Sequence, residues 1–436
     1  MKESNYNIFL DIEDKHYAFN SMTCALAEVE QEFYDILEGI RNNKITDNKR
    51  MLNDMSEGGF VVNDSFDELQ YLKMKSYSGK FGSYGLGLTV ALTMECNFSC
   101  PYCYEAPKRG FINDEVQEAI IKLIEDNAKK NQNISVTWYG GEPTLAIDII
   151  ETMSEKIIQI CKKYNVEYSA FMITNGYLLT KNNIKKLKKS KISGIQVTLD
   201  GVPDVHNSRR KLKSGNNGTF DIIIENIKNT INSGIIVDIR VNVDKTNYTG
   251  IDDLLVILSK HGLQECEINF GHVNAYTEAC SSIGDTCLSV SEYSDVLLDY
   301  QRSLNKNGFV ADDYPMYPMP KSNYCCADTM NSFVIDPQGY LYKCWNDIGN
   351  KKKSVGNILC KETDYQQRDN LEKYILWTPF DFEECVSCKM LPICMGGCPY
   401  NGLYNLGKPE CEKWKYSMDK VLKSICSLTV KNVDRD

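Results

Sequence analysis

Three cysteines on one short loop have the types and spacing that most directly predict chemistry. Cys96, Cys100 and Cys103 form a CxxxCxxC pattern. Thiolates are soft ligands that suit iron–sulfur clusters or zinc. Three of them can hold three irons of a four-iron cluster, which leaves the fourth iron without a protein ligand. The preceding residues 86–94 are mostly apolar and β-prone, so we expect the loop to begin where a strand ends.

Distinctive polar or glycine-containing groups follow, or lie within, several of the next predicted strands. These residues are Gly140, Gly141, Glu142, Pro143, Asn175, Asp200 and Arg240. The paired glycines would let the backbone approach a ligand closely, and Glu142 offers an acceptor for an ammonium group. Each feature is a weak signal alone. Their succession after the cysteine loop predicts one shared site.

Alternating strands and helices must position this site. The predicted strands are Leu86–Met94, Ile134–Tyr139, Tyr168–Thr174, Gly194–Leu199, Val237–Val243 and Glu265–Phe270, with helices between them such as Asp114–Lys129 and Thr219–Ser233. This alternation favours βαβ units and a parallel sheet. Six units predict an α/β fold with a partial (β/α)6 barrel over residues 86–275. We expect its chemistry at the C-terminal ends of the strands.

Cysteines are concentrated again near the C-terminus, where ten of the eighteen lie between Cys325 and Cys426. The candidate metal ligands here are Cys325, Cys326, Cys344, Cys385, Cys388, Cys394, Cys398 and Cys411. In a reducing compartment such density indicates metal or cluster ligation before disulfides. Taken alone, CxxC followed by CxxxC is also typical of a zinc ribbon.

Length and charge limit the classes of protein. A chain of 436 residues predicts two or three domains. A net charge of −10 argues against a nucleic-acid-binding surface. No apolar run approaches a membrane span, and the N-terminus lacks the apolar segment of a signal peptide. We therefore expect a cytoplasmic protein that binds neither nucleic acid nor a membrane.

The remaining segments complete the expected domain organisation. Residues 1–74 are predicted to form a winged-helix-like domain, and residues 75–85, rich in Gly, Ser and Lys, a linker. A bridge is expected over 276–322. A cysteine-rich, loop-like domain is expected over 323–436.

The cysteine loop, Tyr104 and the GGEP sequence at 140–143 together resemble the radical SAM superfamily. The resemblance implies a four-iron cluster on Cys96, Cys100 and Cys103, whose open iron binds S-adenosylmethionine (SAM). It places Glu142 and its glycines near the SAM amine and Tyr102 near the adenine. We expect Pro143, Asn175, Asp200 and Arg240 in the same cofactor site. The alternative for the three thiols is structural zinc, which would need a fourth ligand nearby.

The C-terminal cysteines resemble the SPASM extension, which carries auxiliary clusters. This implies one four-iron cluster on Cys385, Cys388, Cys394 and Cys411. It implies another on Cys344 and Cys398 with Cys325 or Cys326, for a total of three. The second set lacks a clear fourth ligand unless both adjacent thiols serve, and an open iron there could bind a substrate thiolate. The resemblance covers residues 86–275 and 323–411.

The N-terminal pattern resembles the peptide-recognition element of enzymes that modify ribosomal peptides, which bind a leader peptide along a sheet edge. The leading hypothesis is therefore a radical SAM/SPASM peptide maturase, an oxidoreductase of the sactipeptide or ranthipeptide type. It would install a thioether in a precursor peptide and take electrons from an external donor. An anaerobic sulfatase maturase is one alternative, although Trp345 stands where those enzymes have Asp. A non-enzymatic zinc-binding interaction protein is another.

Overall fold

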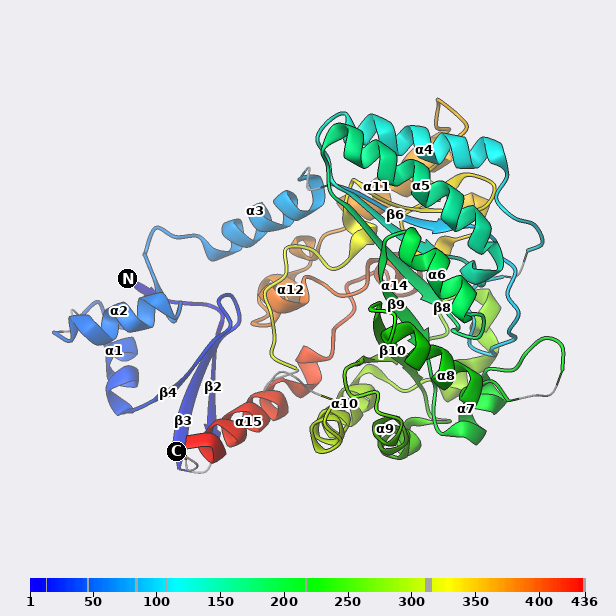
Figure 1. Ribbon diagram of the computed structural model, residues 1–436. Helices are drawn as coiled ribbons and strands as arrows, with labels where there is room; N and C mark the ends of the chain where they lie inside the picture. Colours follow the sequence, from blue (N-terminus) through cyan, green and yellow to red (C-terminus); the bar gives the residue numbers. More distant parts are fainter. Residues whose placement is uncertain are drawn as a thin grey trace. The chain divides into compact units, whose positions relative to one another are not determined.

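Six consecutive parallel strands form one side of a nine-stranded sheet, with the last of the six at its edge (Figure 1). They are β6 Leu86–Ala91, β7 Ile134–Tyr139, β8 Tyr168–Thr174, β9 Ile192–Thr198, β10 Ile236–Val243 and β11 Glu267–His272. They lie side by side in chain order, and every neighbouring pair is parallel. The predicted parallel sheet is thus confirmed, and β7 and β8 have the predicted bounds. Because β6 pairs with β12 rather than with β11, the sheet stays open as a partial barrel.

This computed structural model describes residues 1–12, 14–44, 47–82, 85–106, 108–215, 218–309 and 316–433, with side chains described up to residue 427. The chain divides into two compact units, each treated separately below. One contains residues 1–82, 314–328 and 376–436, and the other contains 83–313 and 329–375. This division differs from the expected domain boundaries, because residues 329–375 belong with the parallel sheet. Residues 83 and 84 of the expected linker and 310–315 of the expected bridge lie outside the described residues.

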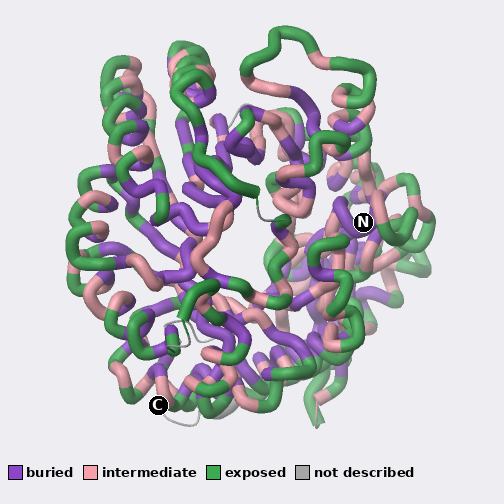
Figure 2. The backbone as a smooth tube through the Cα atoms, turned by 90° about the vertical axis from the view of Figure 1, so that its right-hand side faces the viewer, coloured by how far each residue is buried: buried purple, intermediate pink, exposed green. Residues whose placement is uncertain are grey.

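Helices between consecutive strands cover one side of the parallel sheet (Figure 1). They are α4 Asp114–Ala128, α5 Ile147–Tyr164, α6 Lys181–Lys189, α7 Pro203–Arg209, α8 Phe220–Ile231 and α9 Ile251–Lys260, followed by α10 Val290–Lys306. Right-handed connections between strands in sequential order place all crossover helices on the same side. The strands they cover are mostly buried, whereas the helices alternate buried and exposed positions (Figure 2).

The segment after residue 328 is not simply loop-like, contrary to expectation. Its strands β12 Ser332–Ile335, β13 Tyr340–Tyr342 and β14 Gly356–Asn357 extend the sheet beyond β6, and α11 Tyr365–Leu376 follows. Strand β12 lies parallel to β6, and its apolar residues join a buried cluster with residues from β6 and β7. Burial of this added apolar surface explains why the segment packs on the sheet edge.

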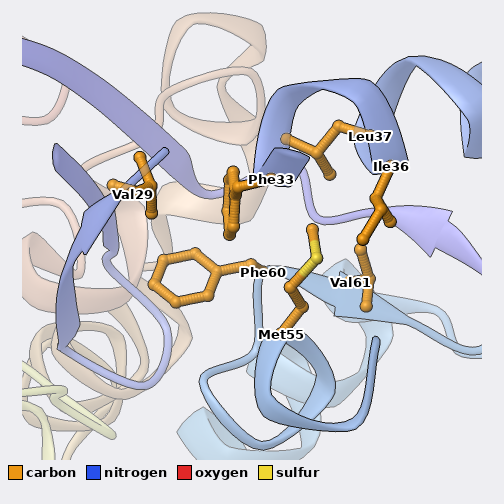
Figure 3. Close-up of a cluster of buried hydrophobic side chains, with 8 residues drawn as sticks. Val29, Phe33, Ile36, Leu37, Met55, Phe60 and Val61 are labelled. Atoms are coloured by element: carbon orange, nitrogen blue, oxygen red, sulfur yellow. The ribbon is translucent and has the colours of Figure 1, made fainter. Parts of the chain in front are cut away.

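The other unit contains a three-stranded antiparallel sheet in the order β2-β3-β4 (Figure 1). Its N-terminal elements are β1 Lys2–Glu3, β2 Asn7–Ile12, β3 Lys15–Asn20, β4 Ala25–Val29, α1 Gln31–Arg41, α2 Lys49–Glu57, β5 Val61–Val62 and α3 Glu68–Phe81. Buried apolar side chains from β4, α1, α2 and the β5 region form its core (Figure 3). The elements from the end of the chain are α12 Glu383–Val386, α13 Leu391–Cys394, α14 Pro399–Asn401 and α15 Trp414–Val433.

Helix α3 corrects the predicted linker, because residues 75–81 continue the helix to Phe81. Lys80 is buried near its end, and its ammonium donates to the Trp377 carbonyl. The helix is thus fixed by contacts within its own unit. Its Gly and Ser residues, which favour a flexible linker in isolation, are overridden by this packing.

Candidate functional site

A cavity of 650 Å³ lies at the C-terminal ends of the parallel strands. The thiol-bearing residues Cys96, Cys100 and Cys103 line it together with residues from the ends of β7 to β11. The structure therefore brings together side chains that are far apart in sequence. Of the predicted cofactor residues, those lining the cavity are Tyr102, Gly140, Gly141, Asn175 and Arg240.

Backbone hydrogen bonds hold the cysteine loop on two sides. On one side the N–H groups of Gly141 and Glu142 donate to the carbonyls of Thr93 and Glu95, at 3.0 and 2.9 Å. On the other side the Ser99 N–H donates to the Lys211 carbonyl at 2.9 Å, and the Lys213 N–H donates to the Asn97 carbonyl at 2.8 Å. The loop is thus fixed before any ligand is bound.

The three thiols fit the donor set of an iron–sulfur cluster. Burial raises the pKa of the Cys96 and Cys103 thiols to about 12, and it also raises the pKa of the Cys100 thiol. Without metal they are thiols at neutral pH, so binding iron as thiolates releases protons. Within the described residues, no three His, Cys, Asp or Glu side chains converge closely enough to hold a single ion. A cluster needs no such convergence, because each thiolate binds a different iron, whereas structural zinc needs four ligands around one point.

The two glycines of the GGEP turn make a close approach to the chain's own backbone. A Cβ on Gly140 would lie 2.2 Å from the Thr93 carbonyl oxygen, and one on Gly141 would lie 2.3 Å from the Glu95 carbonyl oxygen. Gly140 also has a φ of +118°, a conformation that side chains rarely adopt. From the sequence, we expect the two glycines to let the backbone approach a ligand closely. In the structure, the backbone that they approach is that of the cysteine loop and the residues just before it.

Glu142 is fully buried, and protein donors surround its carboxylate. Oε1 accepts from the Thr144 N–H at 3.0 Å, the Thr144 hydroxyl at 2.5 Å and the Thr174 hydroxyl at 2.6 Å. Oε2 accepts from the Asn175 N–H at 2.7 Å. Pro143 is buried directly after it, at the start of a short 3-10 helix. Glu142 thus joins the ends of β7 and β8, and its contact with the SAM amine stays a prediction.

Asn175 continues this connection to the cysteine loop. Its side-chain amide donates to Asn97 Oδ1 at 2.7 Å, and its Oδ1 accepts from the Tyr177 N–H at 3.0 Å. The Asn175 amide also lies 3.9 Å from Cys96 Sγ. The end of β8 therefore positions the first cysteine of the motif.

Tyr102 belongs to a buried network of charged groups. Its hydroxyl donates to the Asp200 carboxylate and accepts from Arg210 Nη1 at 2.6 Å. Asp200 also accepts from the Asn242 N–H at 3.0 Å. The Arg209 guanidinium stacks over the Tyr102 ring at 5.0 Å. Burial holds the pKa of Tyr102 well above its usual value, so this hydroxyl stays protonated and donates.

Arg240 lines the cavity from β10, and its Nε donates to Asn242 Oδ1 at 3.2 Å. The neighbouring strand makes room for its guanidinium, because a Cβ on Gly271 would lie 2.0 Å from Arg240 Nη2. Arg240 was predicted from the sequence as a site residue, whereas Gly271 was not. A missing side chain on the adjacent strand became meaningful only once the pairing of β10 and β11 was known.

Four cavity residues were not predicted from the sequence, namely Glu105, Tyr139, Arg210 and His272, and Trp345 was singled out there only for its position after Cys344. Burial raises the pKa of Glu105 to about 7. His272 ends β11, and its pKa is lowered by burial. Its Nε2 donates to the Leu288 carbonyl at 2.7 Å in the neutral ring, which leaves Nδ1 as an acceptor. The position of Glu105, two residues after Cys103, was the available signal.

One predicted auxiliary set is brought together in the first unit. The nearby thiols of Cys394, Cys411 and Cys388 each contribute, after burial, to the raised pKa of Cys385. The Cys388 N–H donates to the Cys385 carbonyl at 3.1 Å, so the CxxC pair lies on one turn. These contacts are compatible with a shared cluster.

The second predicted auxiliary set is divided between the units. Cys325, Cys326 and Cys398 belong to the first unit, whereas Cys344 belongs to the second. The adjacent thiols of Cys325 and Cys326 are hydrogen-bonded to each other, which raises the pKa of Cys325. Cys344 lies near the cavity residue Tyr104, whose pKa it helps to raise. The ligand set proposed for this cluster stays a prediction.

Comparison with known proteins identifies the domain that carries the cavity. Residues 90–256 match the radical SAM superfamily. The Fe-coproporphyrin III synthase of Methanosarcina barkeri is 28% identical over 225 residues, which are 51% of this chain and 53% of that protein. The chain thus spans about half the length of that relative. The radical SAM cyclopropyl synthase TigE of Paramaledivibacter caminithermalis is 21% identical over 468 aligned positions, covering 93% of this chain and 92% of TigE.

Solved structures share the fold. AdoMet-bound anSMEcpe has a TM-score of 0.61 at 20% identity and covers 79% of this chain and 100% of its own. Streptococcus suis SuiB bound to the precursor peptide SuiA has a TM-score of 0.55 at 18% identity, with coverage of 92% and 96%. Residues 90–256 therefore match a radical SAM domain, and the unit that contains them has an α/β fold with a partial-barrel parallel sheet.

Proposed function

We propose that this protein is a radical SAM peptide maturase that installs a thioether crosslink in a ribosomally made precursor peptide. The observation that carries the proposal is the cavity at the strand ends, which joins three thiols to a wall of polar and aromatic residues. When bound there, a four-iron cluster and SAM supply a carbon radical that removes a hydrogen atom from the substrate.

The chain's own residues would bind the cluster, orient SAM and shield the radical from water. Cys96, Cys100 and Cys103 hold the cluster on a loop fixed by backbone hydrogen bonds. Arg240 and the Tyr102 network supply charged and hydroxyl groups at the cavity wall for the polar parts of SAM. A bound substrate would complete the walls of the cavity and limit access of water, which protects a reactive radical from side reactions.

Similarity along nearly the whole chain supports a peptide substrate. TigE aligns with 93% of this chain, and SuiB, whose structure holds a precursor peptide, covers 92% of it. The three-stranded sheet supplies a surface for a leader peptide. Its central strand is β3, so within the described residues β2 and β4 each pair with a strand on one side only. Such edges can accept an extended peptide as an added strand.

The C-terminal cysteines support an oxidative step that needs electron transfer. Thioether formation removes two hydrogens from the peptide, and one electron must leave after the radical has formed. We propose that Cys385, Cys388, Cys394 and Cys411 hold one auxiliary cluster in this path. We assign a second cluster to Cys344, Cys398 and Cys325 or Cys326, and suggest that it binds the substrate thiolate.

Sulfatase maturation gains no support from the cavity wall. The resemblance to those enzymes would place a carboxylate after Cys344. Here Trp345 follows it, and its ring packs on Tyr139 with centroids 4.8 Å apart. No residue of the Trp345–Tyr139 pair can take a proton as an aspartate would.

The test combines iron content with peptide mass. Anaerobically reconstituted protein is incubated with SAM, a reductant and synthetic peptides from the small reading frames beside its gene. We expect one peptide to become two hydrogens lighter per crosslink and to lose a thiol that alkylation can detect. Replacing Cys96, Cys100 and Cys103 with Ala should lower bound iron from about twelve to about eight and abolish the product.

A matched control replaces three thiols that lie outside the cavity, Cys161, Cys266 and Cys280, with Ala. We expect this control to keep its iron and its product. Zinc in place of iron and sulfide would refute every radical mechanism. SAM cleavage without any lighter peptide would refute the peptide substrate alone.

A further inference from the structure

Two buried polar atoms on the cavity wall have no hydrogen-bond partner. They are Oε2 of Glu105 and Nε1 of Trp345. Both residues line the same cavity, and Glu105 is only 7% exposed. Leaving a buried polar atom without a hydrogen-bond partner is unfavourable, so a ligand that satisfies both atoms binds with an advantage.

Tyr139 connects the two residues. Its ring packs on the Trp345 ring with centroids 4.8 Å apart, and its hydroxyl hydrogen-bonds with the Glu105 carboxyl and the Tyr104 hydroxyl. These three side chains thus form one continuous patch of wall.

The pair is complementary to an amide. Oε2 of Glu105 is an acceptor, and Nε1 of Trp345 can only donate. In an extended chain the N–H donor and the carbonyl acceptor of one residue point to the same side, so one wall can meet both. A lone ammonium or a lone carboxylate would satisfy only one of the two atoms.

We propose that Glu105 and Trp345 form a subsite for the main chain of one extended residue of the substrate. Glu105 accepts from the peptide N–H, and Trp345 donates to a carbonyl of the same segment. Both atoms are nearly shielded from water, so engagement includes a small rotation of each side chain toward the cavity. This inference rests on the proposed peptide substrate. It makes both residues positioning groups that hold a segment of the main chain at the radical site.

The experiment replaces single peptide bonds with esters. An ester keeps the chain length and loses the N–H donor, so each position of the modified region can be tested in turn with the reconstituted enzyme. At one position we expect the ester to raise KM about tenfold in the wild-type enzyme, the loss of one hydrogen bond. With Glu105→Leu the amide and ester peptides should have nearly equal KM values, and Glu105→Gln, which keeps an acceptor, should restore part of the difference.

The tryptophan has a matched control. Trp345→Phe removes the cavity donor, and Trp138→Phe removes a buried indole N–H from a residue that does not line the cavity. We expect a higher peptide KM only for Trp345→Phe. Thermal unfolding of each variant identifies losses that come from misfolding.

The possible outcomes are distinguishable. If the enzyme modifies the peptide and the amide and ester forms differ in KM by the same factor in wild type and Glu105→Leu, the subsite is overturned. The proposed peptide maturase activity would still stand. If KM rises on replacement of an Asn or Gln side chain of the peptide and not on replacement of a main-chain amide by an ester, the site binds a side-chain amide. That result would overturn the main-chain proposal. If no peptide is modified, the proposed function fails and the subsite fails with it.

Discussion

Replacing Gly140 with Ala tests whether the GGEP turn serves the cysteine loop. The new Cβ would lie 2.2 Å from the Thr93 carbonyl oxygen, whereas ordinary contacts begin near 3.4 Å. Both atoms belong to or adjoin fixed backbone, so neither can move away cheaply. We expect the loop to be displaced and bound iron at the first cluster to be lost.

The expected cost has two parts. A side chain at a φ of +118° adds strain of roughly 1–3 kcal/mol. The overlap of about 1.2 Å adds a penalty like that of overpacking, roughly 1–3 kcal/mol. The sum, roughly 4 kcal/mol, corresponds to a fall in Tm of about 7 °C for a unit of this size.

Two other glycines of the same unit separate these parts. Gly234 has a φ of +84° with no heavy atom within 4 Å of the position that a Cβ would take, and Gly250 has open space without a positive φ. We expect Gly234→Ala to cost only the strain, and Gly250→Ala a few tenths of a kcal/mol. Calorimetry of the metal-free proteins and iron analysis after reconstitution give the comparison. If Gly140→Ala is no more destabilising than Gly234→Ala and keeps its iron, the close approach does not explain the glycine.

Three further predictions concern the cavity wall and its support. Gly271→Ala should push the flexible Arg240 guanidinium aside and raise the KM for SAM about tenfold. The free energy of unfolding should fall by less than about 1 kcal/mol. An unchanged KM would mean that Arg240 does not contact SAM. Tyr102→Phe removes one hydrogen-bond partner each from the buried Asp200 and Arg210 side chains. It should lower the free energy of unfolding, measured in urea, by about 2 kcal/mol. An unaltered value would contradict a stabilising role of the Tyr102 hydroxyl. Burial raises the pKa of Asp347 to about 6, so the stability of the wild-type protein falls as pH rises from about 4 to 6. Asp347→Asn, which still accepts from Tyr374, should gain up to about 3 kcal/mol over wild type across that range. A stability difference that does not change with pH would argue against this titration.

No helix in the described part of the chain is both long and apolar enough to cross a membrane. This finding agrees with the sequence, in which no apolar run approached the necessary length. Cellular location stays a prediction.

Strands of the parallel sheet were predictable because their signals are local. The runs 134–139 and 168–174 are rich in β-branched and aromatic residues and end at turn-forming residues, and both match the structure. Strand β4, Ala25–Val29, was missed, because Ala, Leu and Glu do not favour a strand. It forms because β3 offers a paired edge and because Val29 packs into the core of that unit.

The sequence by itself determined the ligand types, their spacing and the order of the strands that carry them. A thiol triad and a succession of strand ends are features of the chain, and chemistry and connectivity follow from them directly. Only the tertiary structure decided what each group faces. In the folded chain Gly140 lies against the backbone of the cysteine loop, and four hydrogen-bond donors surround the Glu142 carboxylate. Glu105 Oε2 has no hydrogen-bond partner. Such outcomes depend on distances across strands that are far apart in sequence, which no local pattern specifies.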